Sequence, residues 1–170
     1  MTVLYHKNLT ERSGAVNQRT MDNFFDIIDT KSARDDFVLS AGSAFTELLF
    51  NTLNHSRTGV GLRANEIALT QYPVQIYYCD GHGRQTLMLQ NYTDELRAEE
   101  LLRRVRILEK GDRHLGAARH IYQDDPDGHD GRGNGLRDIF MESDIVQYRV
   151  IKPRSGSTLR HVTAVARFTN

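Results

Sequence analysis

The chain has 170 residues, and its 22 basic and 22 acidic side chains leave no formal net charge at pH 7. Such a balance provides no general field for a polyanion, which disfavours nucleic-acid binding. Cys79 is the single cysteine, so an internal disulfide is excluded and a reducing compartment fits. Because no signal peptide or membrane-spanning window is found, we expect one cytoplasmic domain over residues 1–170.

The N-terminal part of the chain predicts a short edge strand at 2–5 and a helix at 16–28. The strongest pattern follows at 35–56, which reads as a long amphipathic helix. Its apolar side chains fall on one continuous arc at 100° per residue: Phe37, Val38, Ala41, Phe45, Leu48, Leu49, Thr52 and Leu53.

Beside that arc the same helix carries a polar stripe of Glu47, Asn51 and His55. These residues are spaced i, i+4, i+8 and drift only about 40° per step. A solvated helix face is the simplest interpretation of each residue alone. However, Asn is a poor helix former, and Asn51 and Asn54 both lie in the strongest part of the pattern. This placement favours a functional role for the stripe.

The middle of the chain predicts a hairpin, with strands at 74–79 and 86–90 joined by a turn at 80–84. A charged helix at 94–109 follows, and its Glu–Arg pairs at i, i+4 indicate a solvated face rather than a nucleic-acid patch. A short helix is expected at 114–122. A second hairpin is expected at the end of the chain, with strands at 145–151 and 159–168.

A loop of turn-forming residues at 123–135 precedes a short helix at 136–142. Its end carries Gly131, Gly133 and Gly135, directly before Leu136 and Arg137. Converging backbone N–H groups and the positive end of a helix suit a phosphate. The aspartates of the loop could instead hold a hard cation, but the spacing fails the EF-hand template. We therefore favour a mobile lid.

These motifs resemble the GHKL (histidine-kinase-like, Bergerat-fold) ATPase superfamily. Glu47, Asn51 and His55 are similar to its N-box, and residues 131–136 are similar to the glycine-rich G2 box that closes over phosphates. The order of elements over about 35–168 also matches. The resemblance implies a two-layer α/β sandwich, in which helices cover one face of a mixed, mostly antiparallel sheet.

Within the superfamily the chain is most similar to anti-sigma-factor-type serine/threonine kinases, in particular SiaB-like kinases. The shared features are the length, the charged helix and a Gly-Leu-x-Asp-Ile segment at 135–139. This resemblance implies phosphorylation of a small STAS-like partner, opposed by a PP2C-type phosphatase. No nucleic-acid or membrane partner is expected, and a homodimer is left open.

One motif of the superfamily is missing. The Asp-x-Gly-x-Gly box, whose Asp contacts the adenine amino group, would fall at the end of the second hairpin strand. Asn91 stands there, with no glycine after it. An Asn oxygen can still accept a hydrogen bond from adenine. The similar residues Asp80, Gly81, His82 and Gly83 lie one strand too early.

The resemblance implies that ATP and Mg²⁺ are the cofactors. Glu47 would orient or deprotonate the acceptor hydroxyl, Asn51 would hold Mg²⁺, and Arg137 would assist the lid at the transferred phosphoryl. His55 would contact phosphate or cap its helix. Two alternatives remain: a non-catalytic module that sequesters a partner, and an ATPase whose acceptor is water.

Overall fold

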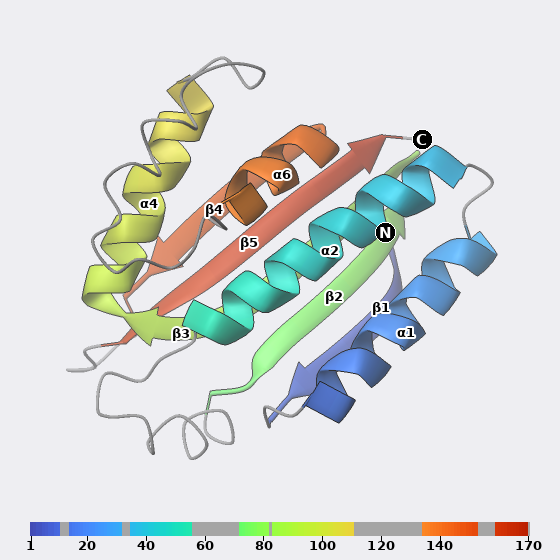
Figure 1. The fold of residues 1–170 in the computed structure, drawn as a ribbon, viewed down its shortest axis with the longest axis horizontal. Coiled ribbons are helices and arrows are strands. Elements are labelled where there is room, and N and C mark those ends of the chain that lie inside the picture. The colour runs from blue at the N-terminus through green and yellow to red at the C-terminus, as the bar shows by residue number, and fades with distance from the viewer. Residues whose placement is uncertain are drawn as a thin grey trace.

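The computed structural model describes residues 1–10, 14–31, 35–55, 72–81, 83–110, 134–152 and 159–169. In these ranges the chain forms strands β1 (Thr2–Leu9), β2 (Val74–Gly81), β3 (Arg84–Asp94), β4 (Ile145–Ile151) and β5 (Leu159–Thr169). The helices are α1 (Gly14–Lys31), α2 (Asp35–His55), α4 (Glu95–Lys110) and α6 (Asn134–Glu142). Figure 1 shows the helices layered on one face of the sheet.

The sheet has the strand order β1-β2-β3-β5-β4, and all four pairings are antiparallel. The expected α/β sandwich with helices on one face is confirmed. A mixed sheet would also contain a parallel pair, and the described strands form none. Two of the pairs, β2 with β3 and β4 with β5, join strands that are consecutive in sequence, and such hairpins are antiparallel. The pairs β1 with β2 and β3 with β5 join strands that helices separate in the sequence, and they are antiparallel as well.

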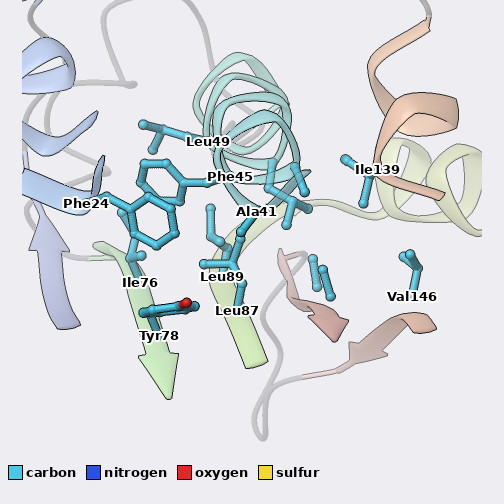
Figure 2. Close-up of a cluster of buried hydrophobic side chains, with 14 of the residues drawn as sticks. Phe24, Ala41, Phe45, Leu49, Ile76, Tyr78, Leu87, Leu89, Ile139 and Val146 are labelled. Atoms are coloured by element: carbon cyan, nitrogen blue, oxygen red, sulfur yellow. The ribbon is translucent and has the colours of Figure 1, made fainter. Parts of the chain in front are cut away.

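Helix α2 is central because its apolar arc packs on the middle of the sheet. Ala41, Phe45 and Leu49 of α2 are fully buried. In Figure 2 Ala41 lies above Leu87 and Leu89 of β3, and Phe45 and Leu49 extend towards α1. The ring of Phe45 also stacks on Phe24 of α1, with ring centroids 3.8 Å apart. One arc of α2 thus joins the sheet to α1, as the sequence periodicity predicts.

The strands run further than the sequence pattern indicates. β1 continues to Leu9, and the first hairpin extends to Gly81 and Asp94. Gly83 in the turn adopts a φ of +71°, which glycine tolerates best. Asp94 accepts a hydrogen bond from the N–H of Arg97 at 2.9 Å and so caps α4. The helix expected at 114–122 and most of the loop at 123–135 lie outside the described residues.

Candidate functional site at the α2–α6 interface

Helix α6 packs beside α2 and runs in the opposite direction (Figure 1). Its C-terminal end lies at the end of β5, because the N–H of Asp144 donates to the carbonyl of Arg167 at 2.9 Å. Its first turn therefore faces the C-terminal half of α2, which carries the predicted polar stripe. The positive end of the α6 dipole is thus directed towards that stripe.

Glu47 lies half-buried on the side of α2 that faces α6. Burial raises the pKa of its carboxyl group above the ordinary value of 4.5, and the charge of Asp138 in α6 raises this pKa further. Two carboxylates therefore interact across the interface, which costs stability when both are ionised. Perturbed pKa values are frequent among catalytic acids and bases, so Glu47 is a candidate for proton transfer.

Asn51 lies about one helical turn beyond Glu47, towards the first turn of α6. Its amide nitrogen is buried, and no group in the described part of the chain accepts a hydrogen bond from it. Buried polar atoms almost always have partners. A carboxamide in this position is suited to a polar ligand, because rotation of the side chain can present either its N–H₂ or its oxygen.

The glycine-rich motif is described only in part. Gly135 lies in the first turn of α6, whereas Gly131 and Gly133 fall outside the described residues. Leu136 packs against the hydrophobic core, so it anchors the helix, and Arg137 beside it is half-buried. His55 closes α2, but its side chain falls outside the described residues.

Asn91 occupies a different place from the predicted one. The motif places it at the end of a strand, but β3 continues for three residues to Asp94. Its side chain is 7% exposed, and the residue pairs with Val162 in the interior of the sheet. The row of alternate residues Leu89, Asn91 and Thr93 faces the helices. Because Asn91 and Thr93 are polar, the alternation of apolar residues stops at Leu89, and a hydrophobicity pattern does not predict the rest of the strand.

Asp138 is a site residue to which the sequence assigned no role. It lies in the predicted Gly-Leu-x-Asp-Ile segment, but its proximity to Glu47 arises only when α6 packs on α2. Helical periodicity places Asp138 on a different face of the helix from the buried residues Ile139 and Phe140. The pattern therefore predicts a less buried position for Asp138, but it does not predict that Asp138 lies near Glu47.

A solved structure has the same architecture over nearly the whole of this chain. A chain of the SiaB–SiaC complex from Pseudomonas aeruginosa matches with a TM-score of 0.73 and 14% sequence identity. The match covers 98% of this chain and 91% of that chain. No protein-family model and no curated protein matches the sequence. At 14% identity the similarity shows a common fold. No helix among the described residues is long and apolar enough to cross a membrane.

The raised pKa of Glu47 predicts a stability change with a definite sign. A carboxyl group with a raised pKa binds more protons in the folded chain, so the free energy of unfolding falls as pH rises from about 4.5 through the folded pKa. Glu47→Gln removes the charge and keeps the shape. We expect its melting temperature at pH 7 to exceed that of wild type by about 1–3 °C.

Scanning calorimetry at two pH values tests this expectation. The difference should vanish below about pH 4, where Glu47 is largely protonated in both states. Asp138→Asn should reproduce part of the gain at pH 7, because it removes the repelling charge. A melting temperature of Glu47→Gln below that of wild type at pH 7 would show that ionised Glu47 stabilises the fold.

Proposed function

We propose that this protein is a Mg-ATP-dependent serine/threonine kinase that phosphorylates a small STAS-like protein in a bacterial partner-switching pathway, opposed by a PP2C-type phosphatase. The observation that carries the proposal is the α2–α6 interface. There the carboxyl groups of Glu47 and Asp138 interact. Asn51 follows one turn after Glu47 on α2, and its buried amide nitrogen has no hydrogen-bond partner among the described residues. The similarity to a chain of a two-protein complex supports a role in partner binding.

The residues present fit a magnesium nucleotide. Mg²⁺ binds through one or two protein oxygens and otherwise keeps water and phosphate ligands, so a complete protein cage is not required. The Asn51 carboxamide would hold the ion, and the first turn of α6, with Arg137, would face the phosphates.

Each residue then has a distinct role in transfer. Mg-ATP supplies the phosphoryl group when bound. Glu47 accepts the proton of the acceptor hydroxyl. Burial, and to a lesser extent the charge of Asp138, raises the pKa of Glu47 and so increases its basicity. Arg137 and the backbone N–H groups of α6 neutralise negative charge that develops on the phosphate oxygens.

Mg-ATP should raise the melting temperature of the protein. A ligand that binds only the folded state stabilises it by about 2.7 kcal/mol at a hundredfold excess over Kd. This corresponds to a shift of about 5–10 °C for a chain of this size. The measurement is thermal unfolding with ATP, with and without Mg²⁺, and with Mg²⁺ alone as the control. An unchanged melting temperature at millimolar Mg-ATP would remove the nucleotide hypothesis.

The burial of Asn91 favours a second candidate function. This residue replaces the expected aspartate, and its side chain is 7% exposed, so little of it is open to an adenine ring. A module that keeps the fold and sequesters a partner without nucleotide would require no adenine contact. Such a module should bind its partner with the same affinity in the presence and absence of Mg-ATP.

A further inference from the structure

Strand β4 forms one edge of the sheet, and its outer side pairs with no described strand. The register with β5 runs without a shift from Ile145 to Ile151, so the edge is regular. The other edge strand, β1, has a register shift between Val3 and Tyr5. Bulges and charges are common devices that protect edges from pairing. β4 has no bulge, and Ile151 is 40% exposed. The strand carries a single charged residue, Arg149, which is exposed.

The sequence of β4 is nearly symmetric about Tyr148. It reads IVQYRVI, so a copy of the strand that runs in the opposite direction places like residues opposite one another. Ile145 faces Ile151, and Val146 faces Val150. Gln147 faces Arg149, which can form a hydrogen bond. Side chains of directly opposed residues lie on the same face of a sheet, so the two members of each pair can contact one another.

The symmetry continues beyond the strand and includes charge. Asp144 and Lys152 are both exposed, and a two-fold axis at Tyr148 places them opposite one another with opposite charges. Asp144 already accepts a hydrogen bond from the N–H of Thr169 at 2.5 Å, and a carboxylate can accept more. An axis at residue 147 would instead place Ile145 opposite Arg149, and an axis at residue 149 would place Gln147 opposite Ile151. Only the axis at Tyr148, of these three, pairs apolar residues with apolar residues and polar residues with polar residues.

We propose that β4 pairs antiparallel with β4 of a second copy of this chain, about a two-fold axis at Tyr148. The two sheets then join into one continuous ten-stranded sheet, with the helices of both copies on the same face. The pairing is isologous, because the same strand serves both copies. This dimer uses a surface separate from the α2–α6 interface and does not depend on the proposed kinase activity.

Sedimentation measurements on charge-swapped variants test the proposal. Gln147→Arg sets two arginine–arginine pairs across the axis and should weaken dimerisation about tenfold or more. The double variant Gln147→Arg/Arg149→Gln recreates the same pair in the opposite order and should restore the wild-type dissociation constant. Both side chains are exposed, so the monomer fold should be unaffected. Gln75→Arg, on the same face of the interior strand β2, is the matched control and should leave dimerisation unchanged.

Disulfide trapping tests the register directly. Opposed Cα atoms lie about 4.5–5.5 Å apart, which a disulfide can bridge, whereas the diagonal between two copies of residue 147 is about 7–8 Å. A mixture of Gln147→Cys and Arg149→Cys chains should therefore cross-link under mild oxidation, and each variant alone should not. The proposal is overturned if wild type stays monomeric at about 1 mM, if the double variant fails to restore the dimer, or if single variants cross-link as fast as the mixture.

Discussion

Glu47→Gln should lower the rate of phosphate transfer by about 10²–10⁴-fold and leave the Kd for Mg-ATP within about threefold of wild type. The reason is that a general base acts on the acceptor hydroxyl, so its loss removes transition-state stabilisation and not nucleotide binding. Glutamine keeps the size of the side chain and cannot accept the proton. The interaction with Asp138 also disappears, so the folded protein should not be weakened.

The measurement is single-turnover transfer from labelled ATP, with nucleotide affinity determined by calorimetry on the same sample. Glu99→Gln is the matched control, because Glu99 is exposed on α4 and lies outside the proposed site. It should transfer phosphate at the wild-type rate. Transfer by Glu47→Gln at the wild-type rate would contradict the role of Glu47 as the base.

Asn51→Ala should have the opposite signature and weaken Mg-dependent nucleotide binding by about tenfold or more. This variant removes a proposed oxygen ligand of the metal, and a tenfold loss of affinity corresponds to about 1.4 kcal/mol of binding free energy. Affinity for ATP without Mg²⁺ should change much less. The comparison of the two affinities therefore separates loss of the metal ligand from general damage to the site.

The stability of the ligand-free Asn51→Ala variant provides a second readout. The amide nitrogen of Asn51 is buried with no partner among the described residues, so its removal should leave the melting temperature close to that of wild type. Asn8→Ala, at an exposed position of β1, is the control and should change neither affinity nor stability. Equal affinities of Asn51→Ala and wild type for Mg-ATP would exclude Asn51 as a ligand.

The sequence predicted α2 well, because a buried face with a period of 3.6 residues is a strong signal. Phe45 and Leu49 lie in the core as that period requires. The position of Asn91 was predicted wrongly because the end of β3 lacks such an apolar pattern. The strand continues through polar residues that the helices cover, and only tertiary packing could place Asn91 in its interior. Within the described residues, local patterns thus identified the helices and strands and missed how far the strands extend.

The candidate site was predictable only in part. Glu47 and Asn51 lie on one helix, so their common stripe follows from spacing alone. The interaction of Glu47 with Asp138 joins residues about ninety positions apart, and a local pattern carries no information on such a contact. The raised pKa of Glu47 depends on this contact and on burial. The chemistry of the site therefore emerges when α6 packs on α2.

Transfer of the labelled γ-phosphate of ATP to a purified STAS-like partner tests the proposed kinase most directly. The wild-type protein should place label on a serine or threonine of the partner, and removal of Mg²⁺ should abolish it. A partner that forms a complex with this protein and remains unlabelled at saturating Mg-ATP would contradict the kinase and leave the sequestering module.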